Sequence, residues 1–393
     1  VHGEDGVARV VPARRAARER RHGREGEETD ESAGHRCIVA ADADPRQSAM
    51  RIGVLTAGGD CPGLNAVIRA VARSAIQNGD EAIGILRGYE GLAKREYKPL
   101  DMRTVAGILH LGGTILSTSS FEPHRENAVD DVKRAFEEDR LAAVVAIGGE
   151  HTMWITRKLY EEDGLPVVGV PKTIDNDVVG TDYTFGFDTA VQVATDAIDR
   201  LHTTAQSHDR LMVVEVMGRN SGWIAVHAGI AGGADGIVIP EVVTTVEELA
   251  EGIQKRHERG KDFSIIVVAE GAKLAFASGE ERLIQPVDST DEYGYPRLGG
   301  IGAALAKELE QRTGYEARVT VLGHVQRGGT PTSTDRILAT RYGAKAYEMV
   351  KNGEFGRMAA IRGSAMTSVP LAEVSGIKEV DLSLLDIAKR FFT

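Results

Sequence analysis

From Met50 onward, short apolar runs alternate with polar clusters and with segments that have helical spacing. The first run, "RIGVLTA", is followed by "GGDCPG" and then by "LNAVIRAVARSAIQNG". Fully apolar short strands between amphipathic helices predict an α/β fold with mainly parallel sheets flanked by helices. In such sheets the functional loops lie at the carboxyl ends of the strands. Polar clusters follow the later apolar runs too, at 141–147, 165–170, 210–216, 263–269 and 317–323.

The composition is that of a folded globular protein. The chain has 393 residues, of which 42% are hydrophobic and 27% charged, and its length suits two to three domains. The net charge of -11 argues against nucleic-acid binding. The longest apolar runs are too short to span a bilayer. Cys37 and Cys61 form neither a disulfide framework nor a zinc pattern, which indicates a reducing, cytoplasmic location.

Residues 1–49 differ from the rest of the chain. They contain many arginines and acids, no lysine and almost no apolar periodicity, so we expect this N-terminal extension to be disordered. Transit peptides are rich in arginine but poor in acids, which argues against targeting. A mis-called start is the other interpretation, because Met50 directly precedes the first expected strand.

The stretch "TAGGDCPGLN" at 56–65 is a glycine loop between an expected strand and an expected helix. Its amides and the helix N-terminus would favour an anion such as a phosphate. The loop matches neither a G-x-x-x-x-G-K-[ST] motif nor a G-x-G-x-x-G motif. A tight turn without a ligand is therefore an equal alternative.

The stretch "PKTIDND" at 171–177 places Asp175 and Asp177 two residues apart, close to Thr173. A positioned aspartate can accept the proton of a sugar hydroxyl in the transition state of phosphoryl transfer. An Asx turn or a helix cap is the alternative, because Asp and Asn are common in both. Its place after a buried strand, in a mostly uncharged stretch, favours the functional interpretation.

Three further strand ends carry polar residues, in "VMGRNSGW" (216–223), "AEGAK" (269–273) and "VLGHVQRGG" (321–329). Arginine suits phosphate because its planar guanidinium binds oxygens in pairs. Each residue alone is more often a surface charge than a ligand, but the repeated placement predicts that they converge on one ligand. The residues are Arg219, Glu270, His324 and Arg327. Arg210 and Arg318 stand at the opposite ends of their strands and are not expected in the same pocket of the same chain.

Together, "IGVLTAGGDCPGLNAVIRA", "PKTIDND", "VEVMGR", "AEG" and "VTVLGHVQRGG" resemble the 6-phosphofructokinase family. The resemblance runs in consistent order from Met50 to roughly Ala346, and "GGE" resembles the actinobacterial mixed-substrate branch. It implies two α/β domains with the active site in the cleft between them. It also implies transfer of a phosphoryl group from ATP, or in some members from pyrophosphate, to the 1-hydroxyl of fructose 6-phosphate in glycolysis, with Mg²⁺. The expected divisions are a phosphoryl-donor domain at 50–186, a sugar-phosphate domain at 187–325 and a helical part at 326–393 that returns to the donor domain.

The resemblance also implies roles for individual residues. Asp175 matches the catalytic base, and Glu150 stands where the family has an acid that serves magnesium. Arg210 and Arg318 match arginines that reach the site of a neighbouring subunit, so a homodimer or homotetramer is expected. The implied sugar-phosphate contacts are Thr173, Asp175, Met217, Gly218, Arg219, Glu270, His324 and Arg327. The implied donor and cofactor contacts are Gly59, Ser120, Phe121, Arg125, Gly149, Glu150, His151 and Thr152.

The chain departs from the family pattern on the donor side. His151 follows the magnesium acid, where glycine is common in ATP users and aspartate in pyrophosphate users. Lys172 resembles pyrophosphate users, Ser120 replaces an arginine that normally reaches the phosphates, and Ser117 replaces a usual glycine. We expect ATP as donor, with pyrophosphate as the alternative. A weakly active or inactive paralogue that binds fructose 6-phosphate is a further alternative, and the sugar-side residues argue against a kinase for another substrate.

Overall fold

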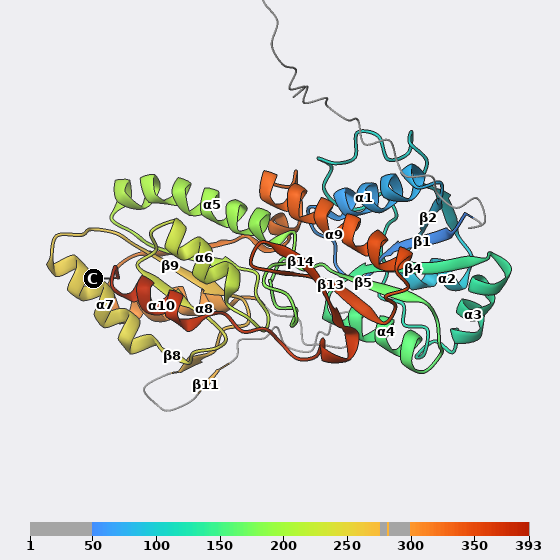
Figure 1. The fold of residues 1–393 in the computed structure, drawn as a ribbon. Coiled ribbons are helices and arrows are strands. Elements are labelled where there is room, and N and C mark those ends of the chain that lie inside the picture. Colours follow the sequence, from blue (N-terminus) through green and yellow to red (C-terminus); the bar gives the residue numbers. More distant parts are fainter. Residues whose placement is uncertain (1–48, 276–280, 283–298, 393) are drawn as a thin grey trace, which may run out of the picture. The chain divides into compact units, whose positions relative to one another are not determined.

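The computed structural model of the chain describes residues 49–275, 281–282 and 299–392 (Figure 1). The prediction for the N-terminal extension therefore lies almost entirely outside the described residues, as does Cys37. Within them, no helix combines the length and the apolar character that crossing a lipid bilayer requires.

The first five strands of the described chain and its last two strands form a seven-stranded sheet. Its five inner strands are parallel, and its two edge strands are antiparallel to their neighbours. In spatial order the strands are β14 (Ala365–Pro370), β13 (Arg357–Arg362), β5 (Val167–Pro171), β4 (Leu141–Gly148), β1 (Arg51–Thr56), β2 (Glu81–Ile85) and β3 (Tyr97–Pro99).

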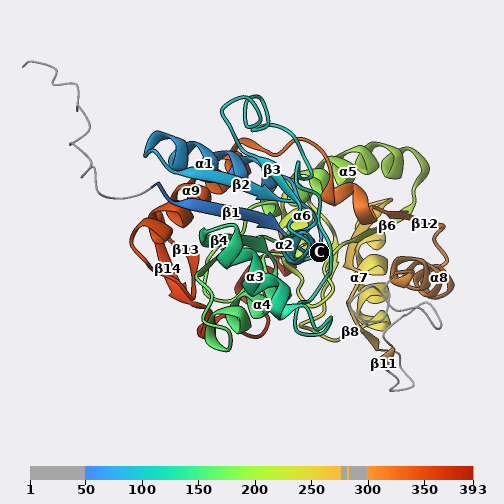
Figure 2. The ribbon, with the colours of Figure 1, turned by 90° about the vertical axis from the view of Figure 1, so that its right-hand side faces the viewer.

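Helices cover both faces of this sheet (Figures 1 and 2). Residues Val145 and Ile147 of β4 pack into one apolar core with α1 (Leu64–Gln77) and α9 (Ser333–Lys351). The alternate residues Val144 and Ala146 pack into a second core on the opposite face. This strand is buried on both sides, as expected of a parallel sheet covered by helices. The helices of the second face are α2 (Gly88–Ala93), α3 (Val129–Glu138) and α4 (Glu150–Glu161).

A second sheet has four strands, all parallel to their neighbours. Met212 and Val214 of β6 pack towards one face, and Leu211 and Val213 towards the other. In spatial order its strands are β12 (Ala317–Val321), β6 (Leu211–Val216), β9 (Ser264–Ala269) and β7 (Gly236–Val238). The first face is covered by α5 (Phe187–His208) and α6 (Trp223–Ala231), and the second by α7 (Val246–Glu258) and α8 (Ile301–Thr313). A small sheet beside it comprises β8 (Thr244–Thr245), β10 (Leu274–Ala275) and β11 (Glu281–Arg282).

The two larger sheets share one core, because the same apolar cluster contains Ile52 of β1 and Val214 of β6. The C-terminal part divides between them. Its strands β13 and β14 belong to the seven-stranded sheet, and its helix α9 packs against that sheet. Helix α10 (Leu382–Lys389) packs against α6 instead. Two 3-10 turns, η1 (Gly323–Arg327) and η2 (Leu371–Glu373), complete the described elements. The predicted α/β class with mainly parallel, helix-flanked sheets is confirmed, and the domain limits stay a prediction.

Candidate active site

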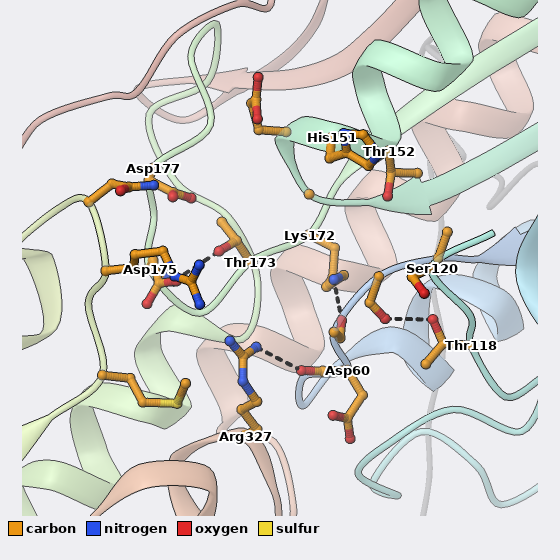
Figure 3. Close-up of a pocket in the computed structure, with 18 of the residues that line it drawn as sticks. Asp60, Thr118, Ser120, His151, Thr152, Lys172, Thr173, Asp175, Asp177 and Arg327 are labelled. Carbon is orange, nitrogen blue, oxygen red and sulfur yellow. Dashed lines mark hydrogen bonds between the residues drawn. The ribbon is translucent and has the colours of Figure 1, made fainter. Parts of the chain in front are cut away.

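A cavity of about 850 Å³ lies where strands of both larger sheets end, and Figure 3 shows part of its lining. Its size is towards the upper end of the range for small-ligand pockets. Loops after β1, β4 and β5 line it from one sheet, and loops after β6, β9 and β12 from the other. The cavity therefore brings together the polar clusters that the strand pattern predicted. The predicted residues that line it are Gly59, Ser120, Phe121, Gly149, Glu150, His151, Thr152, Lys172, Thr173, Asp175, Met217, Arg219, Glu270, His324 and Arg327.

The glycine loop after β1 is held from several directions. Thr118 Oγ1 donates a hydrogen bond to the Gly58 carbonyl at 2.5 Å, and Lys172 Nζ donates one to the Gly59 carbonyl (Figure 3). A Cβ added at Gly59 would lie 3.1 Å from Arg327 Nη1, so a larger residue would crowd this guanidinium. The loop is consequently fixed against the base of the cavity, with its backbone close to a positive charge.

Helix α4 begins at the cavity, directly after β4. An added Cβ at Gly148 would lie 2.2 Å from Thr152 Oγ1, so only glycine allows the first turn of the helix to fold back on the strand. The N-cap is Gly149, which has no side chain that could accept a hydrogen bond from the first-turn amides. The N-terminal amides of α4 thus belong to the cavity wall, where an uncapped helix start favours an anion.

The loop after β5 carries Asp175, Asn176 and Asp177. The Asp175 amide donates to Thr173 Oγ1 at 3.0 Å, and Asn176 is fully buried with a left-handed φ of 52°. The Asn176 side chain accepts a hydrogen bond from the Thr184 amide at 3.0 Å, which anchors the loop. Asp175 and Asp177 both line the cavity, one on each side of this anchor. Among the described residues, Asp175 Oδ1 has no hydrogen-bond partner.

Burial raises the pKa of Asp175 to about 7, well above the ordinary value of an aspartate. This value already includes the negative charges of Asp177 and Glu270, which act to raise it, and the positive charges of Arg327 and Lys172, which act to lower it. Burial also raises the pKa of Asp177, whose negative charge acts on Asp175. This pair can hold or accept a proton near neutral pH, as a general base must.

The opposite wall is built from charged side chains at the ends of β6, β9 and β12. The side-chain oxygen of Gln326 accepts a hydrogen bond from the Met217 amide at 2.8 Å, which ties η1 to the end of β6. Burial raises the pKa of Glu270, and the charge of Arg219 opposes this shift. Gly218 has a φ of 137°, and it holds the turn between Met217 and Arg219 without lining the cavity itself.

The structure also places the residues that depart from the family pattern, namely His151, Ser120 and Ser117. The imidazole of His151 stacks on Trp154 with ring centroids 5.5 Å apart, and its Nε2 lies 3.6 Å from Glu122 Oε2. Ser120 lines the cavity. Ser117 adopts a left-handed φ of 58°, a conformation that glycine adopts without strain. This serine occupies the position where the resemblance predicted glycine.

Besides Gly218, three predicted residues do not line the cavity. Arg125 is exposed and does not line the cavity. Arg210, just before β6, and Arg318, within the edge strand β12, both bind the carboxylate of Glu316, the former at 2.9 Å. The two arginines therefore lie towards the amino ends of these strands, away from the cavity, as the sequence indicated.

The site prediction omitted several residues that line the cavity. Asp60 and Asn220 stand inside the quoted motifs, so adjacency to the glycines and to Arg219 was an available signal. Ile377 belongs to a late segment with no motif, and the sequence gives no signal for it. The omitted residues are Ala57, Gly58, Asp60, Thr118, Ser119, Ile155, Asn220 and Ile377, and Asp177 was named with Asp175 but was assigned no role.

The residues present fit a magnesium ion that arrives with a phosphorylated donor. Magnesium is usually bound by one or two carboxylates together with phosphate oxygens and water. In the part of the chain that the structure describes, no group of three or more His, Cys, Asp and Glu side chains could hold a metal alone. Burial raises the pKa of Glu150, His151 lowers it and Asp177 raises it further. A cation beside Glu150 would offset a charge that burial disfavours.

The comparisons with known sequences agree with this site. The sequence pattern of the family described as Phosphofructokinase matches residues 51–350. The protein named ATP-dependent 6-phosphofructokinase 2 of Streptomyces coelicolor is 52% identical over 346 residues, which are 87% of this chain and 100% of that protein. The protein named Pyrophosphate--fructose 6-phosphate 1-phosphotransferase of Amycolatopsis mediterranei is 51% identical over 347 residues, with the same two shares.

Solved structures give the same result. A phosphofructokinase from Saccharomyces cerevisiae matches with a TM-score of 0.69 and 33% identity over 82% of this chain, which spans only 45% of the yeast chain. A pyrophosphate-dependent phosphofructokinase from Marinobacter aquaeolei matches with a TM-score of 0.71 over 85% of this chain and 86% of the other, and at 22% identity it supports the fold alone. With curated relatives matched over their whole length, the chain belongs to the phosphofructokinase family.

Proposed function

We propose that this chain is a 6-phosphofructokinase that transfers a phosphoryl group from ATP to the 1-hydroxyl of fructose 6-phosphate. The observation that carries the proposal is the place of Asp175, between the glycine loop and the charged wall of one cavity. Its Oδ1 is buried and has no hydrogen-bond partner among the described residues, so this carboxylate keeps an unused acceptor beside the cavity. The products are fructose 1,6-bisphosphate and ADP.

The charged wall would bind the sugar phosphate. Arg219 and Arg327 offer guanidinium groups that bind phosphate oxygens in pairs, and His324 offers a further donor. Glu270 would accept hydrogen bonds from sugar hydroxyls. These contacts would place the 1-hydroxyl towards Asp175, and such positioning supplies much of the catalysis in phosphoryl transfer.

In the chemical step, Asp175 would accept the proton of the 1-hydroxyl as that oxygen attacks the γ-phosphorus of ATP in line. The bond between the γ-phosphorus and its bridging oxygen breaks, and ADP leaves. The amides around Gly59 and at the start of α4 would offset the charge of the transferred group. Lys172 would keep the Gly59 loop in place through its hydrogen bond. A magnesium ion bound at Glu150 supplies charge neutralisation at the donor phosphates.

ATP is the proposed donor because the His151 ring lies along α4, stacked on Trp154. With the ring in this position, the cavity that His151 helps to line still measures about 850 Å³ and would take a nucleotide. Pyrophosphate is the second candidate. It is favoured by the buried Lys172 on the donor side, and relatives of nearly equal identity are named for each donor.

A weakly active or inactive sugar-phosphate-binding paralogue is the third candidate, and it depends on Ser120 and His151. We also propose a cytoplasmic homodimer or homotetramer, in which Arg210 and Arg318 reach the site of a neighbouring subunit. Both arginines lie outside the cavity of their own chain, where they bind Glu316.

A coupled assay for fructose 1,6-bisphosphate with ATP and with pyrophosphate tests the proposal on the full chain. We expect fructose 1,6-bisphosphate to form when fructose 6-phosphate and a donor are both present. We expect a higher kcat/KM with ATP than with pyrophosphate. A higher kcat/KM with pyrophosphate would reverse the donor assignment. Tight binding of fructose 6-phosphate by calorimetry, without product from either donor, would favour the inactive paralogue.

A further inference from the structure

A short segment before α10 lies against the loop that carries the two aspartates. Ile377 forms an isolated antiparallel bridge with Val178, and the Lys378 amide donates to the Asp177 carbonyl at 2.8 Å. Ile377 also lines the cavity. A part of the chain about two hundred residues away from the aspartates in sequence thus forms part of their support.

The ammonium group of Lys378 makes three hydrogen bonds inside this loop. Nζ donates to Asn176 Oδ1 at 3.1 Å, to the Thr181 carbonyl at 3.0 Å and to the Asp182 carbonyl at 2.8 Å. Three donors of one lysine therefore meet three acceptors, which leaves this ammonium fully satisfied although it is largely buried. The contacts join the start of the loop to its end.

The contact with Asn176 matters most for the active site. Asn176 stands between Asp175 and Asp177, is fully buried and holds a left-handed φ of 52°. A residue other than glycine keeps such a conformation only where its surroundings impose it. The Thr184 amide and the Lys378 ammonium both bind Asn176 Oδ1, so they hold this conformation from two sides.

Lys378 is itself fixed by the second sheet. The indole Nε1 of Trp223, the first residue of α6, donates to the Lys378 carbonyl at 2.9 Å. The ammonium lies 5.2 Å from the centroid of the same ring, which adds a cation–π contact. Helix α6 follows the loop that carries Arg219. Lys378 therefore connects the aspartate loop of one sheet to the sugar-side helix of the other.

We propose that Lys378 is a positioning residue, which holds Asn176 and thereby directs Asp175 and Asp177 into the cavity for proton transfer from the sugar. This role rests on the proposed function. Lys378 touches neither substrate nor the reacting atoms, so its effect passes through Asn176. Loss of the ammonium would remove one donor each from Asn176 Oδ1 and from the Thr181 and Asp182 carbonyls. Asn176 Oδ1 would then be held by Thr184 alone, and the loop would relax.

The charges around this contact make the role visible in a pH profile. Burial lowers the pKa of Lys378 to about 8, while Asp177 and Asp182 raise it and Arg362 lowers it. The positive charge of Lys378 in turn lowers the pKa of Asp177. The other charged groups that act on the aspartate pair or its neighbour Glu150 are Lys172, Arg327, Glu270 and His151. Removing Lys378 should therefore move the acid limb of activity to higher pH, because the ionised pair loses a favourable charge.

The test compares Lys378→Met with Lys378→Arg in the full chain. A displaced base slows the chemical step, so we expect kcat of Lys378→Met to fall about ten- to a hundredfold, with KM for fructose 6-phosphate little changed. Lys378→Arg, which keeps charge and donors, should recover part of kcat and the wild-type acid limb. Amide hydrogen exchange in peptides spanning 173–184 should be faster in Lys378→Met than in the wild type.

Lys351→Met is the matched control. Lys351 also joins a late helix to an early segment, through a contact of 3.2 Å with buried Asp80, but it lies outside the cavity. The Lys351→Met variant should have a lower thermal stability, with kcat and the amide hydrogen exchange of residues 173–184 unchanged. The inference would be overturned if Lys378→Met folds and keeps the kcat, the acid limb of the pH profile and the loop hydrogen exchange of the wild type. An inactive wild type would overturn the proposed function instead, and loop exchange would still decide whether Lys378 holds the loop.

Discussion

The proposed donor side and the proposed sugar side of the cavity are built in different ways. The donor side relies on backbone groups, namely the Gly59 loop held by Lys172 and the uncapped start of α4. The sugar side relies on charged side chains such as Arg219 and Glu270. Side-chain departures from the family pattern are confined to the donor side. A site that binds one ligand through its backbone can change nearby side chains at lower cost than a site that binds through the side chains themselves.

The largest effect is expected where the two sides meet. Asp175→Asn preserves the shape of the side chain and removes the base, so kcat should fall by about 10²–10⁴-fold with either donor. Binding of fructose 6-phosphate, measured by calorimetry, should change little. Retention of wild-type kcat would show that another group accepts the proton.

The next largest effect separates the two sides. Arg219→Ala removes a guanidinium from the charged wall and should cost about 2–5 kcal/mol of binding at the sugar phosphate. Initial rates should show a raised KM for fructose 6-phosphate and a nearly constant KM for ATP. An equal rise in both constants would argue against separate sides.

The acid limb of the pH profile should report the aspartate pair. Because the pKa of Asp175 is raised to about 7, its basic form is lost as pH falls through 7. The kcat/KM should therefore decrease about tenfold per pH unit below pH 6. The profile should be measured with the wild type at constant ionic strength. If kcat/KM begins to fall only below pH 5, the aspartates have the ordinary pKa values of that residue type.

The smallest effect concerns the departures on the donor side. Ser120→Arg with His151→Gly restores the residue types that the family resemblance implies for ATP users. The pair should raise kcat/KM for ATP by up to about tenfold, since a charge-assisted contact with phosphate contributes about 1.5–3 kcal/mol and His151 is partly exposed. KM for fructose 6-phosphate serves as the internal control. No gain would show that these two residues do not limit ATP use.

The sequence predicted much of this site because parallel strands place their carboxyl ends at one edge. Arg219 and Arg327 follow neighbouring strands of the four-stranded sheet, and that rule brings them together, whereas Asp175 follows a strand of the seven-stranded sheet and faces them only because the two sheets pack against each other. Strand order and the sharing of one core between the sheets depend on packing over long sequence separations, which periodicity does not contain. Lys378 and Ile377 show the limit most clearly. Their importance comes from a contact with the Asn176 loop, and no local pattern marks it.

The most direct test of the central claim is phosphorus NMR of the full chain with fructose 6-phosphate, ATP and magnesium. The account predicts one new sugar phosphate resonance, from phosphate at carbon 1, growing with the resonances of ADP. It also predicts that Asp175→Asn abolishes this growth on the same timescale. Phosphate on another hydroxyl, or no transfer from either ATP or pyrophosphate, would contradict the assignment of Asp175 between a donor side and a fructose 6-phosphate side.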